Sequence, residues 1–134
     1  MAKKRILIID DDEGYGHIVK VNLEKTGKYE VRLESHSDRA LSSAVKLKPD
    51  LILLDMIMPK LNGLEVLDVI KKDERTLFIP VIMLTSIDSR DLRGETFSKY
   101  AEDFIAKPVN SRELEDKIDS AMSRLGKLDE RSTI

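Results

Sequence analysis

The chain has 134 residues, 41% of them apolar and 36% charged, with a formal net charge of −2. This length suits one domain with a real core, and the balanced charge excludes the large basic field that nucleic-acid binding usually needs. The absence of cysteine excludes disulfides and thiolate metal sites, and without an apolar leader or an apolar run of about 18 residues we expect a cytoplasmic protein.

The first half of the chain alternates between strand and helix patterns. Residues 5–10 (RILIID) form an apolar run typical of a strand that is covered on both faces. An amphipathic helix follows and stops at Gly27, a residue that readily adopts a left-handed conformation. Residues 29–33 (YEVRL) alternate between apolar and polar, which predicts an edge strand. Ser37 can cap a second helix that ends before Pro49.

The alternation continues through the middle of the chain. A third strand over residues 50–55 (DLILLD) precedes a helix that is opened by Asn62. A fourth strand over residues 80–85 (PVIMLT) precedes a weak helix over residues 88–99. Gly94 costs that helix about 1 kcal/mol relative to Ala. We therefore expect the segment 88–99 to be the most mobile element.

The last elements are a short strand and a long helix. Residues 103–106 (DFIA) predict the fifth strand. Asn110, with Glu113 three residues later, is typical of a helix N-terminus. We place the domain at residues 1–126 and expect residues 127–134 to form a polar, frayed tail.

A strict alternation of five strands with helices predicts an α/β fold. Such a chain builds a parallel sheet with helices on both faces, a three-layer α/β/α sandwich. Ligands of these sheets bind at the carboxyl ends of the strands. The residues that chemistry needs are therefore expected at that edge.

Charged side chains follow several of the predicted strands. Asp10 and Asp11 end the first strand, Asp55 ends the third, and Lys107 follows the fifth. Three converging carboxylates cannot all stay ionised unless a cation joins them. Oxygen ligands without His or Cys suit Mg²⁺. Taken alone, each acid is better explained by a turn or a helix cap, but their coincidence with Lys107 favours a magnesium site.

Four segments together resemble a known family. They read ILIIDDDE, LILLDMIMPKLNGLEVL, VIMLTS and DFIAKP, and they occur in the order and at the spacing of the receiver domain of two-component response regulators. The resemblance covers about residues 4–125. It implies a flavodoxin-like, doubly wound fold with five parallel strands in the order 2-1-3-4-5. It also implies a switch that is controlled by phosphorylation.

The resemblance assigns roles around the acidic residues. Asp55 matches the aspartate that accepts the phosphoryl group. Asp11 matches a direct ligand of Mg²⁺, and Asp10 matches a ligand that acts mainly through water. Ile57 matches the position whose backbone carbonyl binds the metal, so its apolar side chain is no objection.

Further roles follow from the same resemblance. Thr85 and Lys107 match the hydroxyl and the ammonium that contact phosphoryl oxygens. Phe104 matches the aromatic switch that moves with Thr85, although plain core filling also explains an aromatic residue there. The bond between Lys107 and Pro108 matches a family junction that is usually cis.

The partners implied are those of a phosphorelay. A sensor histidine kinase or a histidine phosphotransfer protein donates the phosphoryl group, and a downstream protein binds the surface of residues 88–99, residues 103–106 and the last helix. We expect a monomer or a weak, phosphorylation-dependent dimer, without direct contact to nucleic acid or membrane. We expect no enzyme activity beyond self-phosphorylation and self-dephosphorylation at Asp55. Whether the chain stands alone or is cut from a longer regulator stays open.

Two other classes of function also stay open. A phosphohydrolase with an aspartyl intermediate uses the same nucleophile and metal, but it typically needs a second acid two residues later, where this chain has Ile57. A pseudo-receiver binds partners without phosphorylation, but it is expected to have lost an acid or the lysine. Neither loss is seen in this sequence.

Overall fold

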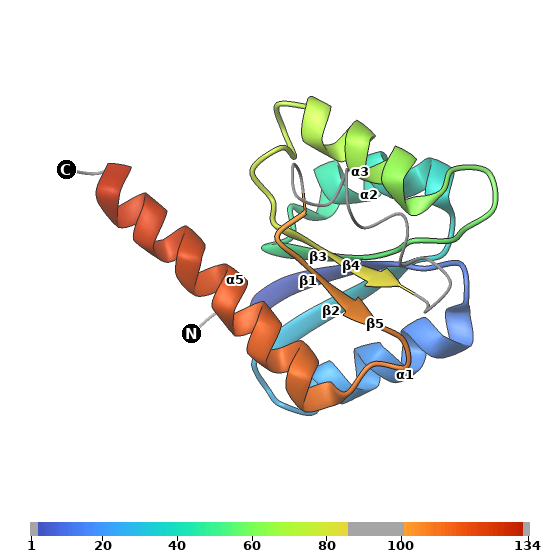
Figure 1. Ribbon diagram of the computed structural model, residues 1–134, viewed down its shortest axis with the longest axis horizontal. Helices are drawn as coiled ribbons and strands as arrows, with labels where there is room; N and C mark the ends of the chain where they lie inside the picture. Colours follow the sequence, from blue (N-terminus) through green and yellow to red (C-terminus); the bar gives the residue numbers. More distant parts are fainter. Residues whose placement is uncertain (1–2, 86–100, 133–134) are drawn as a thin grey trace.

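A parallel sheet lies at the centre of the molecule (Figure 1). The computed structural model describes residues 3–85 and 101–132, with side chains through residue 84 and from residue 101 to residue 124. The strands are β1 (Lys4–Ile9), β2 (Tyr29–Glu34), β3 (Leu51–Asp55), β4 (Val81–Thr85) and β5 (Asp103–Ala106). All neighbours are parallel, and the order is β2-β1-β3-β4-β5. This confirms the predicted fold class and strand order, including the edge position of β2.

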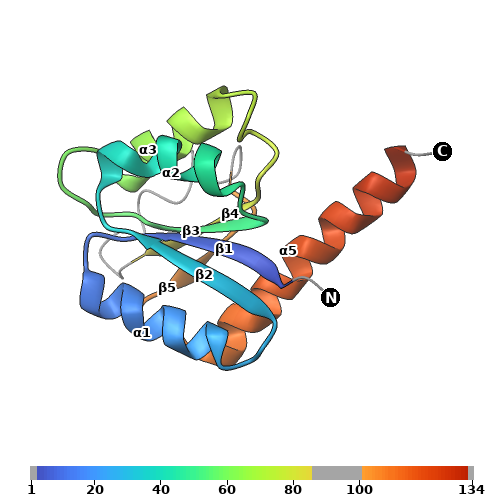
Figure 2. The same ribbon diagram turned by 180° about the vertical axis from the view of Figure 1, so that it is seen from behind.

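Helices cover both faces of this sheet, as Figures 1 and 2 show. Helices α1 (Glu13–Glu24) and α5 (Ser111–Ser132) lie on one face, and α2 (Ala40–Leu47) and α3 (Gly63–Lys72) lie on the other. A short 3-10 turn, η1 (Ser37–Arg39), precedes α2. The predicted three-layer sandwich is therefore confirmed.

The central strands are apolar throughout because each face of the sheet has its own core. In β1, Ile6 and Ile8 pack with α1 and α5, whereas Leu7 and Ile9 pack with α2 and α3. All four side chains are buried. A strand covered on both faces cannot alternate between polar and apolar residues, which explains the continuous run that the sequence shows.

Most predicted helix signals are present in the structure. Asn62 caps α3 and accepts from the backbone N–H of Glu65 at 2.9 Å, and the Glu65 carboxylate accepts from the N–H of Asn62 at 3.2 Å. Asn110 accepts from the N–H of Glu113 at 3.2 Å. Gly27 has a φ of 78°, the left-handed conformation expected after α1.

The prediction that Ser37 caps the second helix is wrong. Ser37 instead begins η1, and α2 starts at Ala40 without a side-chain cap. The Ser37 hydroxyl donates to the carbonyl of Pro59 and accepts from the N–H of Leu61, so it is not available to α2. Tertiary hydrogen bonds have replaced the local one.

Several predicted strand boundaries differ from the structure by one residue. Strand β1 ends at Ile9, so Asp10 follows the strand. The backbone of α5 continues to Ser132, into the stretch that was expected to be a polar tail. Lys, Leu, Glu and Arg favour helices, and Gly126 alone does not stop one. The weak helix expected over residues 88–99 lies outside the described residues. Within the described part of the chain, no helix has both the length and the apolar character to cross a membrane.

Candidate functional site

The sheet order brings four chain segments to one edge. Asp10 follows β1, Asp55 is the last residue of β3, and Lys107 follows β5. Strand β4 lies between β3 and β5, and its last residue, Thr85, pairs with Ala106. The candidate residues therefore meet at the carboxyl end of the sheet, where doubly wound folds bind ligands.

Three carboxylates form a cluster at this edge. Asp10, Asp11 and Asp55 each offer an oxygen, and these oxygens lie within 4.8 Å of one another. Asp10 is fully buried and Asp55 is 6% exposed, whereas Asp11 faces solvent. Asp10 is also fixed by the backbone N–H of Asp12, which donates to Asp10 Oδ1 at 3.0 Å. The structure thus brings together the acids that the sequence placed at this edge.

Lys107 holds two of these acids. Its Nζ lies 3.1 Å from Asp10 Oδ2 and 3.1 Å from Asp55 Oδ1. Burial lowers the pKa of Lys107, but the carboxylates of Asp10 and Asp55 outweigh it and the pKa is raised overall. The ammonium is therefore a permanent positive charge in the site at neutral pH.

One lysine does not neutralise the cluster. Burial, followed by the charge of Asp10, raises the pKa of Asp55 to about 6, although Lys107 and a hydrogen bond from the backbone of Ile57 act in the opposite direction. The ionised form of Asp55 is thus disfavoured in the folded protein. A further cation at the cluster would stabilise that form.

The donor set fits Mg²⁺. The three acids supply hard carboxylate oxygens, and no His or Cys belongs to the described cluster. Such a set suits Mg²⁺ better than zinc or copper. Asp11 is exposed, so a hydrated ion can reach it from solvent. The backbone carbonyl of Ile57 remains the fourth predicted ligand.

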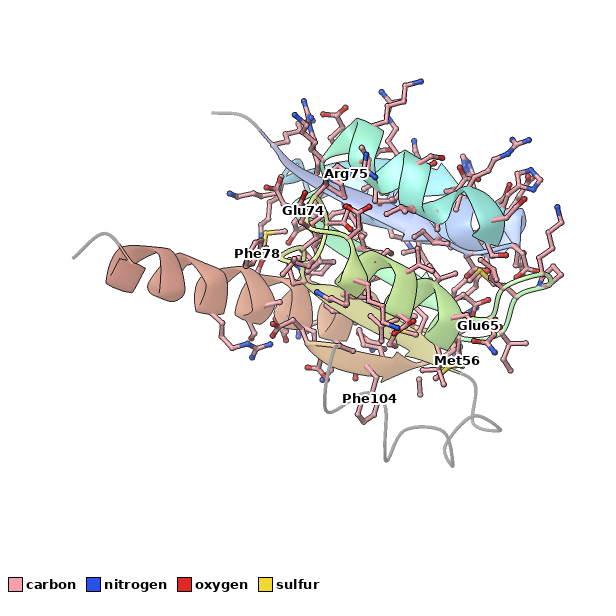
Figure 3. The ribbon with its side chains drawn as sticks, turned by 90° about the horizontal axis from the view of Figure 1, so that it is seen from above. Met56, Glu65, Glu74, Arg75, Phe78 and Phe104 are labelled. Carbon is pink, nitrogen blue, oxygen red and sulfur yellow. The ribbon has the colours of Figure 1, made fainter. Side chains whose placement is uncertain are left out.

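The two switch candidates are described unequally. The side chain of Thr85 lies outside the described residues, but its backbone ends β4 beside the strand of Asp55. Phe104 is partly buried and packs against the core on the side of α2 and α3. Figure 3 shows its ring beside β5. The bond between Lys107 and Pro108 is cis, as the resemblance implied.

Tyr15 is a site residue that the sequence reasoning missed. Lys107 Nζ lies 4.6 Å from the centroid of its ring. Its hydroxyl accepts from the backbone N–H of Val109 at 3.0 Å. Tyr15 therefore holds both the ammonium and the loop after it. An aromatic residue in the first helical turn after the acids was the signal available.

The chain matches known proteins over most of its length. The family model of the response regulator receiver domain matches residues 6–119. The DNA-binding dual master transcriptional regulator RpaA of Synechocystis sp. is 36% identical over 124 residues, which are 92% of this chain and 51% of that protein. The phosphate regulon transcriptional regulatory protein PhoB of Pseudomonas aeruginosa is 37% identical over 134 residues, which are 100% of this chain and 58% of that protein. The chain thus spans about half the length of these relatives.

Solved structures agree with this match. A response regulator receiver domain protein from Clostridium thermocellum has a TM-score of 0.85 at 32% identity, with 93% of this chain and 98% of that chain covered. The chemotaxis protein CheY4 of Vibrio cholerae has a TM-score of 0.81 at 28% identity, with 89% and 98% covered. Both sequence and fold therefore point to the same family.

Proposed function

The chain belongs to the response regulator receiver domains of two-component systems, and on this premise we propose that it is a switch whose Asp55 accepts a phosphoryl group in a Mg²⁺-dependent reaction. One observation carries the proposal. Lys107 contacts both Asp10 and Asp55 at 3.1 Å, at the place where three carboxylates gather. A buried nucleophile beside a fixed cation is what phosphoryl transfer requires.

The proposed step forms one bond and breaks one. A carboxylate oxygen of Asp55 attacks the phosphorus of a phosphohistidine on a kinase or a histidine phosphotransfer protein. The P–N bond breaks, and the imidazole leaves with the electron pair. With a small acyl phosphate as donor, a P–O bond breaks instead and a carboxylate leaves. The product is an aspartyl phosphate on this chain.

The remaining side chains would support this step by charge. Lys107 stays beside the phosphoryl oxygens, and the hydroxyl of Thr85 donates to one of them. Asp10, Asp11, Asp55 and the carbonyl of Ile57 would hold Mg²⁺, which would supply positive charge to the carboxylates and the phosphoryl oxygens when bound. Burial of Asp55 limits the access of water to the product. A single phosphorylation, rather than continuous turnover, is therefore proposed.

Output is proposed to pass through protein contacts. Phosphorylation would draw Thr85 toward the new oxygens and let Phe104 move, which changes the surface near β5 and α5. We place this exchange in the cytoplasm, where such a kinase would act. The expectation that nucleic acid is not contacted finds no support, because RpaA and PhoB are transcriptional regulators and RpaA is a DNA-binding one.

Phosphorylation of variants with a small acyl phosphate tests the proposal. With acetyl phosphate and Mg²⁺, the parent protein should gain one phosphoryl group by mass spectrometry, and Asp55→Asn should gain none. Asp68→Asn is the matched control, because Asp68 is a surface carboxylate of α3 that pairs with Lys72 at 2.9 Å. Release of many phosphates per chain would favour a phosphohydrolase. Absence of uptake by the parent would favour a pseudo-receiver, and either result would overturn the proposal.

A further inference from the structure

The loop that follows Asp55 is tied at both ends. This site loop, residues 56–62, joins Asp55 to α3 and contains Ile57. At its start, the N–H of Met56 donates to the carbonyl of Leu84 at 3.0 Å. At its end, the N–H of Gly63 donates back to the carbonyl of Met56 at 2.7 Å. Met56 and Met58 are buried in the core, so two residues of the loop cannot move freely.

Lys60 is the strained residue of the site loop. Its φ is 69°, in the left-handed region that residues with a Cβ avoid. The Cβ then crowds the following carbonyl oxygen, which makes this conformation unfavourable. Its ammonium lies 3.4 Å from Asp38, an exposed and therefore weak contact. Something else must keep Lys60 in this conformation.

Ser37 supplies hydrogen bonds on both sides of Lys60. Its hydroxyl donates to the carbonyl of Pro59 at 2.7 Å and accepts from the N–H of Leu61 at 3.1 Å. Ser37 is 5% exposed, so water cannot readily replace these bonds. The two residues that flank the strained one are thus held by a single hydroxyl from η1.

We propose that Ser37 is a positioning residue for the phosphoacceptor site. By fixing the peptide groups on either side of Lys60, its hydroxyl holds the whole site loop, including the carbonyl of Ile57, in the arrangement that binds Mg²⁺. Without the hydroxyl, Lys60 relaxes toward negative φ and the loop shifts between its tied ends. The role of Ile57 in this inference rests on the proposed function, whereas the clamp itself rests on the hydrogen bonds.

Magnesium affinity measures the effect of the clamp without any phosphoryl transfer. By isothermal titration with MgCl₂, Ser37→Ala should bind roughly 10-fold more weakly than the parent, as expected when a residue that orients a metal ligand is lost. Ser37→Thr, which keeps the hydroxyl, should recover most of the affinity. Ser42→Ala is the matched control, because its hydroxyl donates to the nearby carbonyl of Arg39 at 3.1 Å. Equal affinities for parent and Ser37→Ala would overturn the inference.

A second substitution tests the link to Lys60. Lys60→Gly removes the strain, because glycine adopts positive φ readily. In that background, Ser37→Ala should cost clearly less Mg²⁺ affinity than in the parent. An equal loss in both backgrounds would show that Ser37 does not act through Lys60 and would overturn the inference. If Ser37→Ala does not fold, Ser37→Cys keeps a similar size, weakens both hydrogen bonds, and should show the same loss in smaller degree.

Amide hydrogen exchange separates this inference from the proposed function. The N–H of Leu61 should exchange slowly in the parent and faster in Ser37→Ala, whether or not the protein is ever phosphorylated. Unchanged exchange would refute the clamp, even if Asp55 takes up phosphate. Conversely, a parent that takes up no phosphate but shows the Mg²⁺ and exchange effects would refute the switch and support the clamp.

Discussion

Burial of the Asp55 carboxylate lowers the free energy of unfolding by an amount that depends on pH. Burial and the charge of Asp10 raise its pKa to about 6, above the value of an unfolded chain. The folded state therefore holds a proton that the unfolded state has released, and stability in chelator should fall as pH rises from about 4 to about 6. Above that range the full penalty, on the order of 3 kcal/mol, is present.

Asp55→Asn should remove this penalty. In urea unfolding with EDTA, we expect the variant to be more stable than the parent at pH 7.5, with a smaller advantage at pH 4.5. The control is Asp68→Asn, whose carboxylate lies on the outer surface of α3. If Asp55→Asn is instead less stable than the parent at pH 7.5, the pairing of Asp55 with Lys107 outweighs burial.

Tyr15 offers two separable contacts to the site. Tyr15→Phe keeps the ring beside Lys107 and loses the bond to Val109, whereas Tyr15→Leu loses both. We expect phosphorylation by acetyl phosphate to slow in the order parent, Phe, Leu, with a total of roughly fivefold for the loss of the ring contact. Tyr29→Phe is the control, because its hydroxyl donates to Asp119 at 2.9 Å, on the face near α5. Equal rates for Tyr15→Leu and Tyr29→Phe would contradict this role.

The sequence allowed the charged residues of the site to be predicted, but not the residues that hold them and the site loop in place. Asp10, Asp55 and Lys107 follow apolar runs, and parallel strands necessarily bring such positions to one edge. The contacts of Tyr15 and Ser37 depend on how a helix and a turn sit against loops far along the chain. No local pattern encodes such long-range contacts, so the sequence predicted only a helix cap for Ser37 and no site role for Tyr15.

At the scale of elements, the start of α3 is constrained because the backbone at Gly63 lies very close to the backbone at the end of β3. A Cβ at Gly63 would collide with the carbonyl oxygen of Asp55 and lie 2.7 Å from Met56 Cα. Backbone atoms of a buried strand end cannot give way as a flexible side chain can. Residue 63 must therefore be glycine for α3 to begin where it does.

Gly63→Ala should consequently destabilise the protein by about 2 kcal/mol or more, the scale of overpacking in a rigid site. Gly14→Ala is a matched control in the first turn of α1. A Cβ there meets only Asp12 Oδ1, at 3.5 Å, so this variant should gain roughly 0.5 to 1 kcal/mol from helix propensity. Urea unfolding of both variants checks the pair. A Gly63→Ala variant as stable as the parent would show that α3 can shift away from β3.

The apolar periodicity of the sequence predicts the elements well but their exact ends poorly. Strand β1 ends at Ile9, but the N–H of Asp10 still donates to the carbonyl of Glu34 at 3.1 Å, so the predicted end was off by one residue. The end of α5 was harder to predict, because polar helix formers predict a solvated helix as well as a frayed tail. The strands were predicted well because burial on two faces leaves a strong apolar signal.

At the scale of the whole molecule, Mg²⁺ should act as a stabilising ligand. A ligand that binds only the folded state raises its stability by mass action, by about 1.4 kcal/mol for each tenfold excess over Kd. Thermal melting of the parent should therefore rise with MgCl₂. Asp11→Ala should melt higher than the parent in EDTA, because an exposed like charge is removed, and should respond little to Mg²⁺.

The control for this experiment is Asp68→Ala, which should melt like the parent with and without Mg²⁺. A parent whose melting temperature ignores MgCl₂ would argue against a metal site at the cluster. If the melting temperature of Asp11→Ala rises with MgCl₂ as much as that of the parent, the metal site is supported but Asp11 is not one of its ligands.

The distance along the chain between Asp10 and Lys107, 97 residues, has a consequence for synthesis on the ribosome. Strands β1, β2 and β3 all precede residue 56, and they are neighbours in the sheet. A growing chain therefore contains this half of the sheet before β4 and β5 have been synthesised. Its acidic edge has no lysine partner until β5 has emerged and joined β4. A chain whose translation stalls before β5 therefore presents the acids without the ammonium of Lys107.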